Sequence, residues 1–357
     1  MKKNPNMDST PAELSVIIPT INEAQALPAL LDELFHQSDV RLELIIADGG
    51  SSDGTQQLAA DHGAILSETA CGRGHQMNQG AKLASAPLLL FLHADSSLTT
   101  PTLLADALKA LKSAAKHLSQ PLLAGHFRLR FLRTESGHDL AYRYYEEKSA
   151  LNRRECTNGD QGLLLSQEFF QQLGGFDESL WFLEDQRLAE TIRQQGTWIT
   201  LPGELGTSAR RFEQEGLGRR MVLSALIMNF HAMGLSEFFH RAGAVYHNQD
   251  RTGQLQLSPI FKLITEMNRE AGRQVSRQRW LATGEYVSSH AWQPFFYLDV
   301  AMEHHFSIKH RLFLSLYDRL FHPLSRLRPL HYFSAGLTWL WFTAYRTLLT
   351  YQEKRHG

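Results

Sequence analysis

The stretch Leu88-Leu-Leu-Phe-Leu-His-Ala-Asp95 decides the fold predicted for this chain. It is a short apolar run that begins after Pro87 and ends abruptly at His93 and Asp95. A run of this length predicts a fully buried strand rather than a helix. Ligands of open α/β sheets bind just beyond the carboxyl ends of the strands, where Asp95 would lie. A carboxylate there can hold a divalent cation or merely cap the following turn, and this stretch alone leaves both interpretations open.

Two earlier segments repeat the pattern of a buried strand that ends in polar residues. The first covers residues 14–19, and we expect it to stop at Pro19 because proline donates no ladder hydrogen bond. The second covers residues 42–48 and ends at Asp48, before a glycine- and serine-rich turn. A helical pattern over residues 24–36, with leucines on one face, separates the two strands. This β-α-β-α order predicts an α/β fold with a mainly parallel, doubly wound sheet.

An arginine between two glycines, in the segment Gly72-Arg-Gly74, precedes the central strand. The glycines allow the backbone around Arg73 to approach a ligand closely, and a guanidinium is a natural partner of phosphate. The alternative is a flexible loop with a solvated arginine. The turn at residues 48–55 has neither the lysine of a P-loop nor a well-formed dinucleotide fingerprint. The sequence therefore supports neither an ATPase nor a dinucleotide cofactor.

The composition is that of an ordinary globular protein. The chain has 357 residues and a formal net charge of -1, so no overall field attracts nucleic acid. Its two cysteines form neither a disulfide framework nor a zinc set, and its first residues lack the apolar region of a secretion signal. These features predict a cytoplasmic protein with no nucleic acid partner. No apolar run reaches the roughly 20 residues that a spanning helix needs.

Three motifs stand in the order that is typical of one enzyme family: Val16-Ile-Ile-Pro-Thr-Ile-Asn-Glu23, Ala47-Asp-Gly-Gly-Ser-Ser-Asp-Gly-Thr55 and His93-Ala-Asp95. With these motifs, residues 14–245 resemble glycosyltransferase family 2. Within it they resemble a subgroup associated with radical-SAM and selenium-related domains, sometimes labelled arsenosugar-biosynthesis-like. The resemblance implies a GT-A fold over 14–245, a nucleotide-diphosphate sugar as donor, and transfer to an acceptor hydroxyl with inversion of the anomeric centre.

The same resemblance implies the donor site. Asp95 would hold Mn²⁺ or Mg²⁺, although the family's metal motif often has an acid where this chain has His93. Arg73 would neutralise the leaving diphosphate, and Asp48 would contact the base or ribose of the nucleotide. The donor-binding residues expected in this way are Pro19, Asn22, Glu23, Asp48, Arg73, Asn78 and Asp95.

An acid pair, Glu184 and Asp185, stands at the start of a further helical pattern. Acids in the first turn of a helix are favoured by its dipole, which would be a purely structural explanation. By resemblance, Asp185 is the general base that takes the acceptor proton, and Glu184 helps to position the substrate. The residues implied for the active-site turn and the acceptor side are Asp160, Gln161, Gly175, Phe176, Arg210 and Arg211.

Residues 250–357 lie beyond the resemblance and are mostly helical in pattern, an extension of unknown role. The segment 337–349 is rich in tryptophan and leucine, so it suits a peripheral membrane contact, self-association or packing within the protein. Two alternatives to a transferase of unidentified acceptor remain open. One is a polyprenyl-phosphate sugar synthase at the cytoplasmic membrane face, with a lipid acceptor. The other is a sugar-nucleotide binding protein that has lost catalysis.

Overall fold

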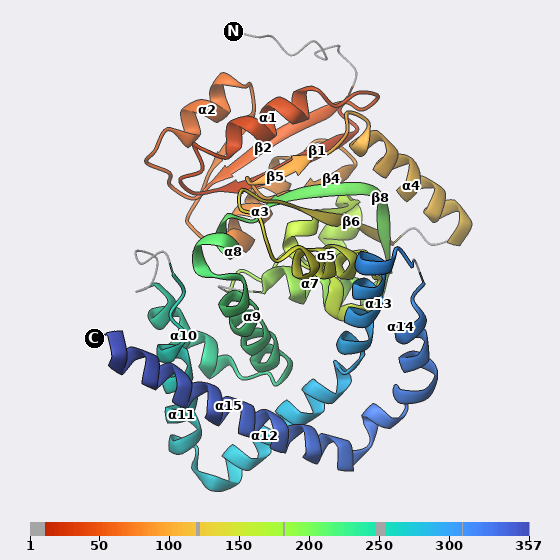
Figure 1. Cartoon of the computed structure of the whole chain (residues 1–357). Coiled ribbons are helices and arrows are strands. Elements are labelled where there is room, and N and C mark those ends of the chain that lie inside the picture. Colours follow the sequence, from red (N-terminus) through yellow and green to blue (C-terminus); the bar gives the residue numbers. More distant parts are fainter. Residues whose placement is uncertain (1–10, 119–121, 181–182, 248–253, 309, 357) are drawn as a thin grey trace. The chain divides into compact units, whose positions relative to one another are not determined.

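The computed structural model describes residues 11–118, 122–180, 183–247, 254–308 and 310–356 (Figure 1). The chain divides into two compact units. The first holds the residues up to Thr134 together with Ala141–Ala209, and the second holds Glu135–Leu140 together with the residues from Arg210 onward. Position 250, the predicted start of the C-terminal extension, lies outside the described residues.

The first unit is built on a sheet that has eight strands within the described residues, in the order β3-β2-β1-β4-β7-β6-β8-β5. The strands are β1 (Leu14–Thr20), β2 (Leu42–Asp48), β3 (Ile65–Glu68), β4 (Leu88–Phe91), β5 (Ser96–Leu98), β6 (Leu123–Leu132), β7 (Leu163–Ser166) and β8 (Thr197–Ser208). β3, β2, β1 and β4 pair in parallel, and β1, β2 and β4 are three strands that the sequence predicted. Beyond β4 the sheet is mixed, because β7 inserts antiparallel between β4 and β6, and β5 pairs antiparallel with β8.

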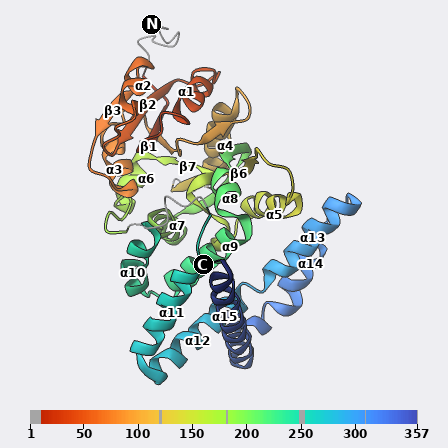
Figure 2. The same cartoon turned by 60° about the vertical axis from the view of Figure 1, so that its left-hand side comes forward.

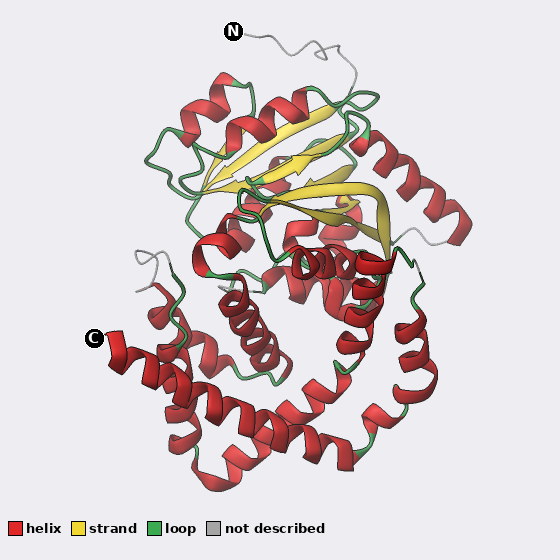
Figure 3. Ribbon diagram, in the orientation of Figure 1, coloured by secondary structure: helices red, strands yellow, loops and turns green. Residues whose placement is uncertain are grey.

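Helices cover both faces of this sheet (Figure 3). Those up to residue 195 are α1 (Leu27–Phe35), α2 (Thr55–Asp61), α3 (Arg73–Leu83), α4 (Leu103–Leu118), α5 (Asp139–Ser149), α6 (Gln167–Leu173) and α7 (Glu184–Gln195). Ile18 of β1 is buried in one core with α1 and α4, and its neighbour Ile17 in another with α3. Because successive side chains of a strand point to opposite faces and both faces are covered, β1 is mostly apolar, and its polar residues Ser15 and Thr20 are also buried. The predicted doubly wound arrangement is confirmed.

Pro19 lies inside β1, which continues to Thr20, so the expectation that the strand stops at the proline is wrong. β1 pairs with β4 only as far as Ile17. Beyond that residue β1 has a ladder only on the side of β2. Proline is tolerated where one edge of a strand makes no ladder bonds.

The second unit is built of helices in the part that the structure describes (Figure 2). They are α8 (Arg210–Glu215), α9 (Leu217–Ala232), α10 (Ser236–His247), α11 (Ser258–Glu270), α12 (Gly272–Ser289), α13 (Trp292–Phe306), α14 (Leu312–Leu316), a π-helical turn (Tyr317–Phe321), a 3-10 turn (Leu324–Arg326) and α15 (Arg328–His356). None of the described helices is both long and apolar enough to cross a membrane.

Along the chain, the change from the first compact unit to the second falls after Ala209, inside residues 14–245 of the predicted catalytic domain, whose extent stays a prediction. The reason is a shared apolar core, in which α9 and α10 bury side chains together with α11 and α15. Phe230 stacks on Phe238 with ring centroids 4.1 Å apart, and Phe261 stacks on Phe342 at 4.6 Å. The helices after Ala209 therefore pack with the C-terminal helices.

Candidate active site

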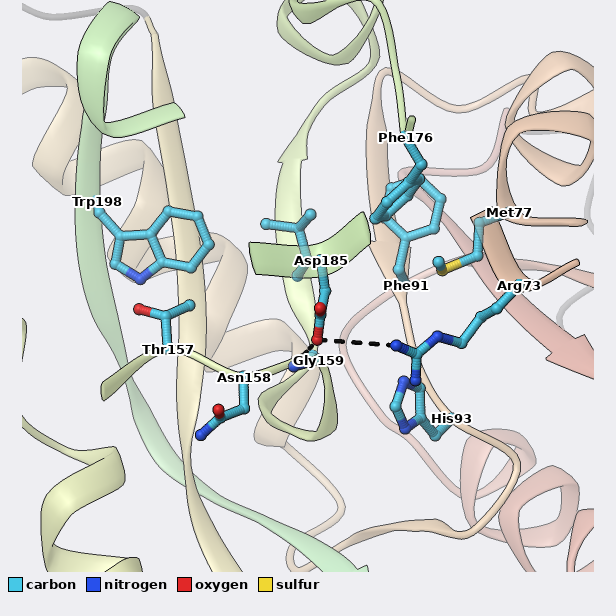
Figure 4. Close-up of a pocket in the computed structure, with 12 residues that line it drawn as sticks. Arg73, Met77, Phe91, His93, Thr157, Asn158, Gly159, Phe176, Asp185 and Trp198 are labelled. Atoms are coloured by element: carbon cyan, nitrogen blue, oxygen red, sulfur yellow. Dashed lines mark hydrogen bonds and ion pairs between the residues drawn. The ribbon is translucent and has the colours of Figure 1, made fainter. Parts of the chain in front are cut away.

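A pocket in the first unit gathers residues from α3, from the end of β4, from the turns before β7, and from α7 and β8 (Figure 4). Its lining residues are Arg73, Met77, Phe91, His93, Thr157, Asn158, Gly159, Gly162, Leu163, Phe176, Asp185 and Trp198. The pocket therefore contains the predicted phosphate-binding arginine, the predicted general base and one predicted acceptor-side aromatic residue.

Arg73, the first residue of α3, faces the acid pair at the start of α7. Its Nε donates a hydrogen bond to Oε1 of Glu184, and its Nη2 lies 3.9 Å from Oδ2 of Asp185. Burial opposes the charge of this guanidinium, but Asp185 and Glu184 outweigh it and raise the pKa of Arg73 above its ordinary value. Glu184 is buried, with 1% of its side chain exposed, and its Oε2 has no hydrogen-bond partner among the described residues.

The Asp185 carboxylate is held by backbone donors. The N–H of Gly159 donates to Oδ2 at 2.7 Å, and the N–H of Gln186 donates to Oδ1 at 2.8 Å. A Cβ on Gly159 would lie 2.6 Å from Oδ2 of Asp185, so only glycine permits this approach. Leu183, which precedes α7, has a left-handed φ of 66°, a conformation that costs free energy in a non-glycine residue. That conformation turns the chain into α7 with both acids in its first turn.

His93 and Asp160 form a second polar pair beside Asp185. Nδ1 of His93 lies 3.0 Å from Oδ1 of Asp160, whose side chain is 44% exposed. The other ring nitrogen, Nε2, lies on the side of Gly159, where an added Cβ would come within 3.2 Å of it. His93, the first residue of the His93-Ala-Asp95 motif, therefore contacts the turn that contains Asp160.

Asp95 lies in the turn between β4 and β5 and is half-buried. Among the described residues its carboxylate has no hydrogen bond and no ion pair. The same part of the chain contains no group of three or more His, Cys, Asp or Glu side chains that could hold a metal ion. The donor set therefore does not fit a cation held by protein ligands alone. It fits a cation that one carboxylate shares with substrate phosphates and water, as magnesium often is.

Asp48 ends β2 as predicted, but its carboxylate is completely buried and already engaged within the chain. Its donors are the hydroxyls of Thr20 and Ser51, the backbone N–H groups of Gly50 and Ser51, and the side-chain amide of Gln56. Burial raises the pKa of Asp48, and these hydrogen bonds more than compensate, so the pKa lies below its usual value. In this structure the carboxylate of Asp48 stabilises the turn that follows β2.

Asn22 and Glu23 tie the loop after β1 to the loop after β2. The N–H of Asn22 donates to Oγ of Ser51 at 2.8 Å, and the Asn22 side chain accepts from the N–H of Ser52 at 2.9 Å. The N–H of Glu23 donates to the hydroxyl of Thr55 at 2.9 Å. These bonds hold both strand ends in one arrangement at the carboxyl edge of the sheet, close to Pro19.

Asn78 joins α3 to the turn that carries Gly175 and Phe176. Its amide donates to the carbonyl of Phe176 at 2.9 Å, and its Oδ1 accepts from the N–H of the same residue at 2.9 Å. Gly175 has a φ of 76°, and a Cβ there would lie 2.7 Å from Oδ1 of Asn78. Phe176 then packs edge-on against Phe91 with ring centroids 5.0 Å apart. Phe176 thus lines the pocket, and Asn78 and Gly175 hold the turn that carries it.

Gln161 is completely buried and supports the turn that carries Gly159 and Asp160. Its amide donates to the carbonyl of Ser149 at 2.7 Å, and its Oε1 accepts from the N–H of Asn158 at 2.6 Å. Both acceptor-side arginines, Arg210 and Arg211, open α8 in the second unit and are exposed. They are not among the residues that line the pocket.

Trp198 is a pocket residue that the sequence analysis missed. Its indole Nε1 donates to Nδ1 of His126, whose Nε2 lies 3.1 Å from the carbonyl of Ser149. Burial lowers the pKa of His126 to about 4, so the ring is neutral and can accept from the tryptophan. Thr157, Asn158 and Gly159 were missed as well, although the glycines around Asp160 and Gln161 pointed to this turn.

Residues 15–174 match the family model described as glycosyl transferase family 2. Over 91 residues the chain is 43% identical to a PGL/p-HBAD biosynthesis glycosyltransferase of Mycobacterium tuberculosis, a match that covers 24% of this chain and 36% of that protein. Over 201 residues it is 26% identical to the O-antigen chain rhamnosyltransferase RfbN of Salmonella typhimurium, covering 52% and 62%. The chain therefore spans only about a third of the length of the mycobacterial relative.

A solved structure of mannosyltransferase PcManGT from Pyrobaculum calidifontis, in complex with GDP-Man and Mn²⁺, aligns over 93% of this chain and 88% of that one. Its sequence identity is 20% and its TM-score is 0.48. The family match and the mixed sheet with helices on both faces confirm the predicted GT-A type of α/β fold.

Proposed function

We propose that the chain is an inverting glycosyltransferase, because residues 15–174 match the model of glycosyl transferase family 2. It would move a sugar from a nucleotide-diphosphate donor to an acceptor hydroxyl. The observation that supports this most is the arrangement of one cation and one carboxylate in the pocket, Arg73 and Asp185, at 3.9 Å. Sugar transfer needs both a group that neutralises the leaving diphosphate and a base for the acceptor.

Asp185 is proposed as the general base. One of its oxygens takes the proton of the acceptor hydroxyl, while the acceptor oxygen forms a bond to the anomeric carbon. The bond from that carbon to the diphosphate oxygen breaks, and the nucleoside diphosphate leaves with the electron pair. A direct displacement of this kind inverts the anomeric centre. The N–H of Gly159 fixes the carboxylate in place for this step.

Arg73 is proposed to stabilise the negative charge that develops on the leaving diphosphate. A guanidinium has five N–H donors in a planar fork. Bonding to Glu184 through Nε leaves the two Nη groups for phosphate oxygens. Glu184 would then position Arg73 rather than take part in proton transfer.

A divalent cation would add Lewis-acid stabilisation of the diphosphate, with Asp95 as its protein ligand. We propose that Pro19, Asn22, Glu23 and Asp48 form the strand-end loops that receive the nucleotide, with Asn78 supporting the pocket wall. The acceptor would bind against two turns. One contains Asp160 and Gln161, and the other contains Gly175 and Phe176. Arg210 and Arg211 remain candidates for this acceptor side.

The catalytic region is proposed to cover residues 14–245 in a cytoplasmic enzyme, with residues 250–357 as its extension. Membership of the radical-SAM and selenium-associated subgroup is proposed on the motifs alone. A polyprenyl-phosphate acceptor is the second candidate, and the exposed apolar side chains of the C-terminal helices favour it.

Donor binding and turnover test the proposal. A thermal-shift screen with UDP, GDP, CDP and dTDP, each with and without Mn²⁺, should find a nucleotide that stabilises the protein by about 2.7 kcal/mol at 100 times its Kd. Asp185→Asn should lower the turnover of the matching sugar nucleotide by 100-fold or more, since a general base contributes at least that factor. Asp61→Asn, at an exposed position of α2, is the control and should leave turnover unchanged. Full turnover by Asp185→Asn would contradict the assignment of the base.

A further inference from the structure

Large exposed apolar side chains concentrate at the C-terminal end of the second unit. Among the described residues, 25 such side chains are exposed, and 18 of them lie between Tyr297 and Tyr351. We call residues 306–351 with their exposed side chains the C-terminal apolar surface. Those from 306 onward are Phe306, Ile308, Leu312, Leu316, Leu320, Phe321, Leu324, Leu327, Tyr332, Phe333, Leu337, Trp339, Leu340, Trp341, Leu348 and Tyr351. A soluble monomer rarely exposes this much without a binding role.

The exposed side of α15 is apolar along nearly its whole length. Phe333, Leu337, Leu340, Leu348 and Tyr351 are 62%, 51%, 57%, 49% and 62% exposed. At 100° per residue these five positions fall within an arc of about 80°, and they extend over about 27 Å of helix. An exposed helix face is ordinarily polar, so this stripe is an apolar face without a partner in the described structure.

The opposite side of α15 anchors the helix in the second unit. Ala335 and Phe342 are buried there, and Phe342 stacks on Phe261 and contacts Trp280. On the helix, both positions lie roughly opposite the stripe that includes Leu337. The packing of α15 within its own unit therefore turns the stripe outward.

The charge of this segment is opposite in sign to that of the rest of the chain. Residues 307–357 contain 8 Lys and Arg against 2 Asp and Glu, a net charge of +6, which leaves -7 for the other 306 residues of a chain whose total is -1. Arg319, Arg326 and Arg328 are exposed between the leucines. Basic residues interleaved with leucine, tryptophan and tyrosine are the composition that an anionic membrane interface binds.

We propose that the C-terminal apolar surface docks on an anionic phospholipid membrane, with the stripe of α15 in the headgroup region. A second copy of the chain is the less suitable occupant, because a two-fold interface would bring two segments of +6 together. An anionic lipid surface instead offers an acyl-chain region for the apolar side chains and negatively charged headgroups for the basic ones. This inference stands apart from the proposed function, since it rests on no pocket residue.

Flotation of the full chain with vesicles tests the inference. Binding should be strong to vesicles of phosphatidylcholine and phosphatidylglycerol at 7:3 and about 100-fold weaker or more to pure phosphatidylcholine. Raising the salt from 0.05 to 0.5 M should weaken the binding further, because salt screens the attraction.

Two variants separate the apolar from the ionic contribution. Leu337→Gln/Leu340→Gln/Leu348→Gln replaces the three leucines of the stripe with residues that still favour a helix, and binding should fall roughly 10-fold or more. Arg319→Gln/Arg326→Gln/Arg328→Gln should weaken binding to the anionic vesicles about 100-fold, because each basic residue near such a surface contributes about a factor of five. Pure phosphatidylcholine binding should hardly change in the arginine variant.

The matched control is Leu83→Gln/Leu118→Gln/Leu132→Gln, which changes leucines of the first unit that are 47%, 53% and 43% exposed. It should bind vesicles like the unchanged protein. Circular dichroism melting checks that all three variants fold. The proposal fails if the unchanged protein does not float with anionic vesicles, or if the control loses binding as the stripe variant does. It also fails if light scattering shows a dimer that the stripe variant abolishes, since the occupant would then be a second copy.

Discussion

The ion pair of Arg73 and Glu184 stabilises the fold and also holds the proposed phosphate-binding arginine in the pocket. Residues 111 positions apart in the chain form an ion pair in which the carboxylate is 1% exposed and the guanidinium 40% exposed. Removing one partner of such a pair leaves the other charge buried without compensation. Solvent screens the guanidinium, which is 40% exposed, so the pair stabilises the fold less than a fully buried pair would.

We expect Arg73→Ala to lower the free energy of unfolding by about 2 to 3 kcal/mol, because the buried carboxyl group of Glu184 loses its partner. Glu184→Gln in the same chain should restore most of this loss, since the double variant buries no unpaired charge. Urea denaturation of both single variants and the double variant measures the coupling. Strictly additive losses would contradict the buried pair.

His126 makes stability depend on pH. Its pKa is about 4 in the folded protein, chiefly because the ring is buried, against about 6.5 in an unfolded chain. Between these values the unfolded state binds a proton and the folded state does not, so stability falls as the pH drops from about 6.5 to about 4. The full effect is about 3 kcal/mol.

Urea denaturation at pH 7.5 and pH 4.5 checks this. His126→Gln should lose less stability than the unchanged protein between the two values, because no ring remains to be protonated on unfolding. His117→Gln, at an exposed position of α4, should keep the full difference. Equal losses in all three proteins would show that His126 does not titrate on unfolding.

Helix packing in the second unit depends on a close approach of α12 and α15. A Cβ on Gly284 of α12 would lie 2.2 Å from the carbonyl oxygen of His331 and 2.7 Å from Cβ of Ala335. Backbone atoms cannot move aside as a flexible side chain can. Gly336, on α15, has nothing within 4 Å of the place where a Cβ would stand.

The two glycines should therefore respond in opposite directions. Gly284→Ala should destabilise the protein by about 1 to 3 kcal/mol, because the helices must separate. Gly336→Ala should be neutral or stabilising by up to about 1 kcal/mol, since alanine favours a helix. Thermal melting followed by circular dichroism at 222 nm compares them. A stable Gly284→Ala protein would contradict the packing of α12 on α15.

In the molecule as a whole, the pocket residues and the C-terminal apolar surface belong to different compact units. Substitutions at sites that share no partners usually act independently. Asp185→Asn should therefore leave vesicle binding unchanged. The Leu337→Gln/Leu340→Gln/Leu348→Gln variant should keep the stabilisation by nucleotide within about 0.5 kcal/mol. A loss of nucleotide stabilisation in the leucine variant would show that the two units are energetically coupled, and it would contradict this prediction.

The sequence by itself determined the parallel half of the sheet and the helical character of the C-terminal part, and it carried the motifs that resemble glycosyltransferase family 2. These follow from features that lie within contiguous residues, such as the apolar run before Asp95 and the strand-helix alternation from Leu14 onward. The acid pair was visible for the same reason, since Glu184 and Asp185 are neighbours in the first turn of α7.

The tertiary structure alone decided which residues meet. Arg73 pairs with Glu184, and Gly159 with Asp185, through contacts between distant segments that no local pattern encodes. The side chain of Gln161 is buried and donates to the carbonyls of Phe127 and Ser149. The sequence around Gln161 does not indicate these partners. It likewise left the stripe of α15 exposed, because a helix that is apolar on several sides can bury only the side that its neighbours cover. Sequence periodicity specifies that a segment is apolar, and only the folded arrangement determines whether a partner is present.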